Sequence, residues 1–117
     1  MGISISKLYD VCAEYNLSKA DFNTCAVLNN WHSLGSELEE AVRDSQEASK
    51  KYQRPFVLQD SYAFNESITK LFYDKAYADE MLDFYRNTIL PRASEKSTLA
   101  SKIRGWLYRQ RLYWGEP

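Results

Sequence analysis

The sequence predicts an all-α fold: a compact single domain of five or six helices spanning residues 1–117. Apolar residues recur at spacings of three and four along almost the whole chain, which is the period of an amphipathic helix. Only four glycines and three prolines interrupt this pattern, and alternating β-branched stretches are nearly absent. A chain of 117 residues with 44% hydrophobic residues can form one core and is short for two domains.

The first two helices are expected from about Ser4 to Tyr15 and from Lys19 to about Asn30. Asn16 between them can take the left-handed conformation that ends a helix. Ser18, with an acidic residue three positions later, resembles a capping box that starts the second helix. The expected core positions of the two helices are Leu8, Val11, Cys12, Tyr15, Phe22, Cys25 and Ala26.

A third helix is expected from Ser36 to about Lys51, started by a capping box of Ser36 and Glu39, and it completes a three-helix N-terminal part, residues 1–54. Acidic residues crowd its outer faces, as expected for a solvated surface near a helix N-terminus. Its expected inward positions are Leu38, Ala41, Val42, Ser45, Ala48 and Tyr52.

Residues 55–117 are expected to form an extended connector at Pro55–Asp60, a long helix and a basic, aromatic C-terminal helix. The long helix would run from Asn65 to Leu90, because no glycine or proline interrupts this stretch, and Pro91 would end it. Its apolar surface leaves open a homodimer. Its expected core positions are Ile68, Leu71, Phe72, Ala78, Leu82, Tyr85 and Ile89.

The last helix is expected from about Ser97 to Trp114, with one apolar face made of Leu99, Ile103, Trp106, Leu107, Tyr113 and Trp114. We expect this face to pack on the core, held by Ile103, Trp106 and Leu107. On that arrangement Trp106→Ala abolishes folding, because removing a buried Trp costs about 3–5 kcal/mol. The opposite side of the helix would carry Gly105, Tyr108 and Leu112.

Charge is distributed unevenly along the chain. Residues 1–90 hold nine basic and fourteen acidic residues (net −5), whereas residues 92–117 hold six basic and two acidic residues (net +4). In the last helix Lys102 and Arg109 flank one side of the apolar face, and Arg104 and Arg111 flank the other. These cations could pair with the acidic first part of the chain, neutralise phosphates beside a stacking aromatic ring, or lie on an anionic membrane.

The segment Leu8-Tyr-Asp-Val-Cys-Ala-Glu-Tyr-Asn-Leu-Ser18, followed by residues 19–25, resembles a helix-turn-helix DNA-binding unit of the lactose-repressor headpiece type. Asn16 stands where such units usually have glycine, Cys12 replaces a small alanine, and Asp21 places an acid on the presumed recognition helix. The resemblance implies that Lys19, Ala20, Asn23 and Thr24 face the major groove. The full set of predicted nucleic-acid contacts is Lys7, Lys19, Asn23, Thr24, Lys102, Arg104, Arg109 and Arg111.

Catalytic and cofactor chemistry has little support in the sequence. His32 is the only histidine, and Cys12 and Cys25 lack the close spacing of zinc ligands, so we expect no enzyme, no metal site and no cofactor. No signal peptide or membrane-spanning run is apparent, so a cytoplasmic location with reduced cysteines is expected. A membrane would be a partner only if Gly2, which fits the N-myristoylation pattern, were lipidated.

Two functions remain open from the sequence. The first is a small regulator of transcription or of a mobile element that binds nucleic acid, in the first place DNA, through the basic residues above. The second is a protein-binding module, such as an inhibitor, an immunity protein or an adaptor, that acts through a face rich in tyrosine and arginine. The two differ in salt dependence, because phosphate contacts weaken steeply as salt rises.

Overall fold

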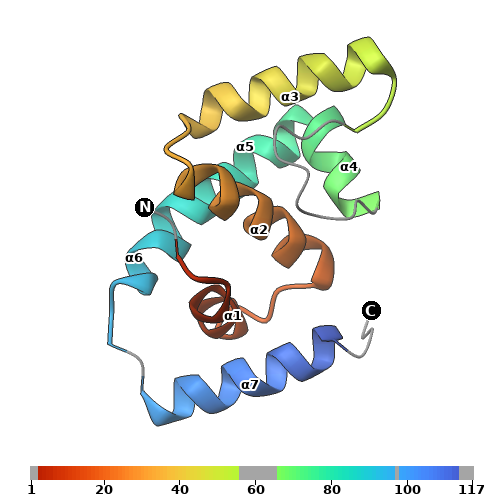
Figure 1. Cartoon of the computed structure of the whole chain (residues 1–117). Helices are drawn as coiled ribbons and strands as arrows, with labels where there is room; N and C mark the ends of the chain where they lie inside the picture. Colours follow the sequence, from red (N-terminus) through yellow and green to blue (C-terminus); the bar gives the residue numbers. More distant parts are fainter. Residues whose placement is uncertain (1–2, 56–65, 97, 114–117) are drawn as a thin grey trace.

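Helix α2 (Lys19–Ser33) lies in the middle of the molecule, and the other helices surround it (Figure 1). The computed structural model describes residues 3–55, 66–96 and 98–113. The expected connector after Pro55, and the residues Gly2 and Trp114, lie outside this part. The described residues are helical with turns and no strand, so the all-α fold class is confirmed.

Helix α2 begins directly after its predicted cap Ser18, and helix α1 (Ile5–Ala13) begins one residue after its expected start at Ser4, which is its N-cap. The Ser4 hydroxyl accepts a hydrogen bond from the Lys7 amide at 3.2 Å, and the Ser18 hydroxyl accepts one from the Asp21 amide at 3.1 Å. Asn16 has φ = 50° and turns the chain between the two helices, as expected. Tyr15 is 38% exposed rather than in the core, because α1 ends before it.

Helix α3 (Leu38–Tyr52) lies on the opposite side of α2 from α1 (Figure 1). The predicted capping box is wrong: the N-cap is Glu37, and it makes no side-chain cap bond. The amide of Ser36 is used instead to close the end of α2, by donating to the Trp31 carbonyl at 3.1 Å after Gly35 at φ = 80°. Tyr52, the last residue of α3, is 52% exposed and does not reach the core.

The predicted long helix is divided into α4 (Glu66–Tyr73), α5 (Lys75–Phe84), a π-helical turn η1 (Tyr85–Ile89) and α6 (Leu90–Ala93). Asp74 causes the break, since its backbone is extended and its side chain accepts from the Tyr77 amide at 3.1 Å. In η1 the Leu90 amide donates to the carbonyl of Tyr85, one residue further back than in an α-helix. The chain therefore continues through Pro91, which lies in the first turn of α6, where a missing N–H has no cost. The expectation that Pro91 ends the helix is wrong.

The core forms between α2 and the apolar faces of α1, α3, α4 and α5. Helix α2 is buried on several sides, so one of its polar residues, Asn29, is enclosed with it. The Asn29 side chain holds the start of the chain by bonding both the amide and the carbonyl of Ile3, at 2.8 and 2.7 Å. Its Oδ1 also accepts from the Tyr85 hydroxyl at 2.9 Å. The central fully buried side chains include Leu8, Cys12, Cys25, Leu28, Trp31, Leu38, Ile68, Leu71, Phe72 and Ile89.

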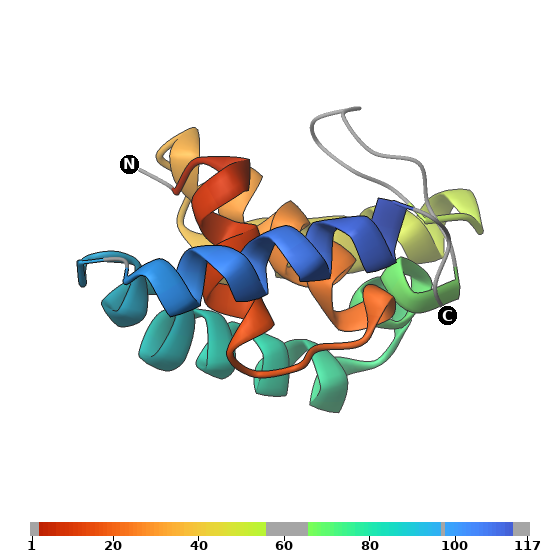
Figure 2. The same cartoon turned by 90° about the horizontal axis from the view of Figure 1, so that it is seen from below.

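Helix α7 (Leu99–Tyr113) is the outermost layer, and it packs mainly on α1. Figure 1 places α7 beyond α1 and far from α3, and Figure 2, seen from the α7 side, shows it crossing in front of the rest of the molecule. Because α7 lies beyond α1 and far from α3, the basic α7 and the acidic α3 are on opposite sides of the molecule.

None of the described helices is long and apolar enough to cross a membrane.

Candidate binding face on helix α7

Helix α7 is attached to the domain by its small and aromatic side, the reverse of what the sequence predicts. Ser101, Tyr108 and Leu112 are 8%, 4% and 7% exposed, and Gly105 is buried against Asp10 of α1. Glycine allows this contact because it has no Cβ to hold the two backbones apart. Tyr108 lies edge-on to Phe22, with ring centroids 6.0 Å apart, and its hydroxyl donates to the Leu17 carbonyl at 3.0 Å.

Burial of the Tyr108 ring raises the pKa of its hydroxyl, so this group stays protonated and acts as a donor. A phenol that keeps its proton suits a contact with a backbone carbonyl. The periodicity of the sequence did not reveal this arrangement. A hydrophobicity pattern gives most weight to large aliphatic side chains and tryptophan, and little weight to Tyr108 and Gly105. The one available signal was Gly105 itself, since a glycine inside a helix has a cost that a close approach can offset.

The larger apolar side chains of α7 are on its outer face. Leu99 is 74% exposed, and Ile103, Trp106 and Leu107 are 51%, 54% and 55% exposed. The prediction that Ile103, Trp106 and Leu107 hold the helix on the core is therefore wrong, and with it the expectation that Trp106→Ala unfolds the protein. Four large apolar residues on one exposed helix face form a contiguous stripe, and such stripes mark interaction sites.

The four cations of α7 fall into two groups. Arg109 Nη1 lies 2.9 Å from Asp10 Oδ1, and Arg111 Nη1 donates to Asn16 Oδ1 at 3.2 Å, so both arginines contact α1 or the turn after it. Lys102 and Arg104 are exposed, and no hydrogen bond or ion pair joins the side chain of either to another described residue. The expected pairing of basic residues with the acidic part of the chain is thus seen for Arg109.

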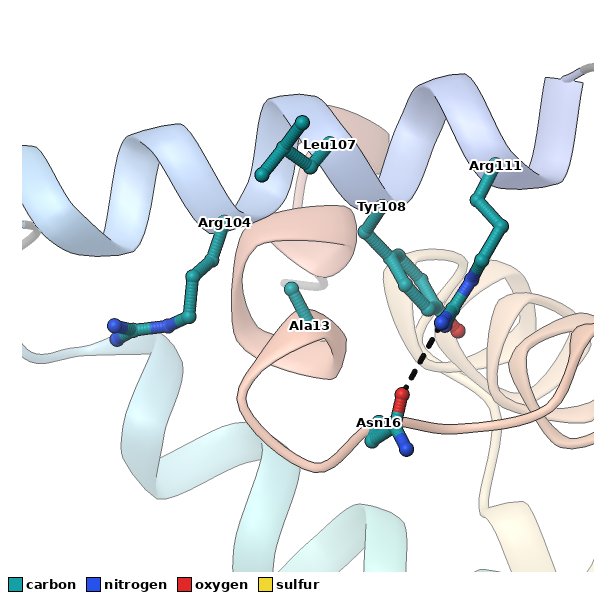
Figure 3. A pocket seen from close by; sticks show the side chains of 6 residues that line it. All are labelled: Ala13, Asn16, Arg104, Leu107, Tyr108 and Arg111. Carbon is teal, nitrogen blue, oxygen red and sulfur yellow. Dashed lines mark hydrogen bonds between the residues drawn. The ribbon is translucent and has the colours of Figure 1, made fainter.

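Beside the stripe, a pocket of 210 Å³ opens between α7 and the end of α1 (Figure 3). In Figure 3, Arg104 and Arg111 leave α7 on either side of Ala13, and the dashed line marks the bond from Arg111 to Asn16. The lining residues are Ala13, Asn16, Arg104, Leu107, Tyr108 and Arg111. Ala13 and Asn16 do not stand out in the sequence as site residues, since they reach the pocket only through the packing of α1 on α7.

Of the other predicted nucleic-acid contacts, Lys7 lines a second pocket together with Arg104, whereas Lys19, Asn23 and Thr24 lie on α2. Lys7 is on α1 and its Nζ donates to the Glu95 carbonyl at 3.2 Å. Lys19 is exposed at the start of α2, and Asn23 is half-buried one turn later. Thr24 is fully buried, and its hydroxyl lies 3.2 Å from that of Tyr77 on α5, so its side chain is not available to a partner.

The same contact with α5 covers part of the presumed recognition helix. The Tyr77 hydroxyl donates to Asp21 Oδ1 at 2.8 Å, and burial raises the pKa of this tyrosine. Helix α2 is thus packed on the side where the resemblance places groove contacts. Sequence comparison of a short segment could not reveal this, because Tyr77 lies 56 positions from Asp21 in the chain.

The two cysteines are brought together in the core, where a side-chain hydrogen bond with Cys12 and burial raise the pKa of the Cys25 thiol. His32 lies edge-on to the ring of Tyr85, with centroids 6.0 Å apart, and Cys12 and Cys25 are buried with free thiols. Among the described residues, no three His, Cys, Asp or Glu side chains are close enough to hold a metal ion. Comparison of the chain with protein-family models, curated proteins and solved structures found no match.

Proposed function

We propose that this protein is a non-catalytic protein-binding module that docks the outer face of α7 into an apolar groove of a partner protein. The observation that carries the proposal is the exposure of Leu99, Ile103, Trp106 and Leu107 on a helix that is attached by its other side. These residues could have been buried by rotating α7, yet the helix is bonded to α1 in the orientation that leaves them outside.

The spacing of the exposed residues supports a helix-in-groove contact. Leu99, Ile103 and Trp106 stand at positions i, i+4 and i+7, and Leu107 widens the same face. Amphipathic helices that enter hydrophobic grooves use anchors at these positions. Tryptophan is also among the residues that contribute most to binding energy when it is enclosed in an interface.

The attachment of α7 supports binding as a preformed element. Tyr108 and Leu112 pack into the domain, and Arg109 bonds Asp10 at 2.9 Å, so the helix is already in place before a partner arrives. Ordering flexible side chains and segments is a main cost of association, and a preformed helix reduces it. The flanking cations favour a partner groove with carboxylates at its rim.

Nucleic-acid binding is the second candidate. It is supported by Lys102 and Arg104, which are exposed beside Trp106, because cations next to an aromatic ring can hold a phosphate while the ring stacks on a base. Its support is narrower than that of the protein-binding proposal. Thr24 is enclosed and Arg109 is paired with Asp10, which leaves only Lys102, Arg104 and Arg111 as exposed cations on the described part of α7 for phosphate neutralisation.

The test is affinity capture from a lysate of the source cells, with and without nuclease, followed by mass spectrometry. The test variant is Leu99→Ala/Trp106→Ala, and the matched control is Leu34→Ala/Tyr52→Ala, which removes residues of similar exposure (56% and 52%) that are not on α7. We expect a protein that the wild type and the control retain and the test variant loses, whatever the nuclease treatment.

Two results would count against the proposal. One is capture of the same proteins by the wild type and the α7 variant. The other is binding of random duplex or single-stranded DNA in a gel shift that weakens steeply between low and physiological salt and requires Lys102 and Arg104, which would favour the nucleic-acid candidate.

A further inference from the structure

The pocket between Arg104 and Arg111 lies directly beside the α7 stripe, and Leu107 belongs to both. A partner segment that covers Leu107 therefore passes over the pocket. Building on the proposed function, we infer that the partner inserts an aspartate or glutamate side chain into this pocket, where the guanidinium group of Arg111 binds the carboxylate and Arg104 adds positive charge from the opposite side of Ala13.

Charge is the first argument. The two charged residues that line the pocket are both arginines. The acids of the adjoining helix α1 are directed to other partners: Asp10 bonds Arg109, and Glu14 bonds Arg92 and the Ser101 hydroxyl. No described acidic residue lines this pocket, whereas Arg104 also lines a second pocket together with Asp10, Glu14 and Glu95, so an incoming carboxylate would add the first negative charge on the Arg111 side.

The polar groups around the pocket are donors, which is the second argument. The last carbonyls of α1 already accept from the amides of Glu14, Tyr15 and Asn16, and the Leu17 carbonyl accepts from Tyr108. Asn16 Oδ1 accepts from Arg111, which leaves the amide nitrogen of this side chain as a further donor. A carboxylate, which only accepts hydrogen bonds, matches such a lining.

Shape and order favour a side-chain carboxylate. The guanidinium group of Arg111 lies over the ring of Tyr108, 5.0 Å from its centre, and this contact together with its bond to Asn16 restricts its movement. A planar guanidinium held in this way can form paired hydrogen bonds to a carboxylate. Ala13, Leu107 and the Tyr108 ring supply apolar walls for the methylene stem, and 210 Å³ is enough for one such side chain.

The test uses a displayed library of random amphipathic helical peptides, selected on the immobilised domain. We expect the selected peptides to combine bulky apolar residues with one aspartate or glutamate at a constant position. For a synthetic peptide from this selection, changing that acid to its amide should raise Kd about tenfold or more, as should Arg104→Gln/Arg111→Gln in the domain. When the amide peptide is combined with the Arg104→Gln/Arg111→Gln domain, Kd should rise no further than with either change alone.

The matched control is Arg43→Gln/Lys50→Gln, which removes two exposed cations of α3 that do not line the pocket and should leave Kd within about twofold. Apolar selected peptides whose Kd is insensitive to Arg104→Gln/Arg111→Gln would overturn the carboxylate inference and leave the α7 proposal standing. Peptides that bind Leu99→Ala/Trp106→Ala as well as the wild type, or no enrichment on the wild type, would overturn both.

A third result separates carboxylate from phosphate. If phosphatidylglycerol vesicles or duplex DNA, whose anionic groups are phosphates alone, displace the peptide only when Arg104 and Arg111 are present, while the acid-to-amide change has no effect, the pocket accepts phosphate and the inference is wrong.

Discussion

Replacing Gly105 with alanine would place a methyl group in the contact between α1 and α7. A Cβ atom built at this position lies 2.8 Å from Cγ and 3.0 Å from Cα of Asp10, and closer still to one carboxylate oxygen. These separations are shorter than normal van der Waals contact, so part of the structure must move. The carboxylate cannot rotate away without loss, because Oδ1 accepts from Arg109 at 2.9 Å, and Cα belongs to the backbone of α1.

The size of the effect follows from opposing terms. Alanine is better than glycine inside a helix by about 1 kcal/mol, which favours the variant. Overpacking costs about 1–3 kcal/mol, and disturbing a half-buried ion pair adds up to about 1 kcal/mol. We therefore expect Gly105→Ala to lower the free energy of unfolding by up to about 3 kcal/mol, which at its upper end is a substantial part of the total stability of a small domain.

Urea unfolding followed by circular dichroism measures this change, and Asp10→Ala provides the matched background. Without the carboxylate the two shortest contacts of the new methyl are removed and Cα at 3.0 Å is the nearest atom that remains, so the loss caused by Gly105→Ala should shrink or become a gain. A gain of about 1 kcal/mol in both backgrounds would refute the reasoning, because helix propensity alone would then explain the result and the two helices could not be in tight contact.

Three further predictions concern single side chains. Trp106→Ala should change the free energy of unfolding by no more than about 0.5 kcal/mol, because this ring is 54% exposed; a loss near the 3–5 kcal/mol of a core Trp would show that it is buried. Glu39→Gln should cost about 0.5–1 kcal/mol at neutral pH, since the exposed pair with Arg86 lowers the pKa of Glu39 from its usual 4.5 to about 2. That contribution is fully present above pH 4.5 and should fade as pH falls towards 2, so a difference between the two proteins that does not vary with pH would contradict it. Tyr85→Phe should cost about 1–1.5 kcal/mol by chemical unfolding, because its buried hydroxyl donates to Asn29; unchanged stability would show that this bond contributes nothing.

Local signals in the sequence predicted most of the helical pattern. The all-α class follows from apolar spacing, and the starts of α1 and α2 follow from the hydroxyls of Ser4 and Ser18, which bond amides three residues away. The turn at Asn16 depends on its own backbone preference. These features involve residues close together in the chain, so the sequence alone contains the information that determines them.

The break at Asp74 and the passage through Pro91 were harder to predict. Asp74 can stay within a helix or cap a new one, and packing selects the cap because it lets α5 place Tyr77 against α2. A proline fits best in the first turn of a helix, where its missing N–H leaves no hydrogen bond unmade. The π-helical turn ends at Ile89, so Pro91 falls in the first turn of α6. In both cases a local preference has two outcomes, and the surrounding core decides between them.

The candidate site depended most on tertiary structure. From the sequence alone, α7 was correctly expected to be a helix with an apolar face flanked by Lys102, Arg109, Arg104 and Arg111. Which side of that helix packs was decided by fit against α1, where Gly105 permits close approach and the Tyr108 hydroxyl finds a carbonyl. Hydrophobicity measures the tendency of a side chain to leave water, whereas docking depends on shape and hydrogen-bond partners from distant segments, and those exist only once the chain is folded.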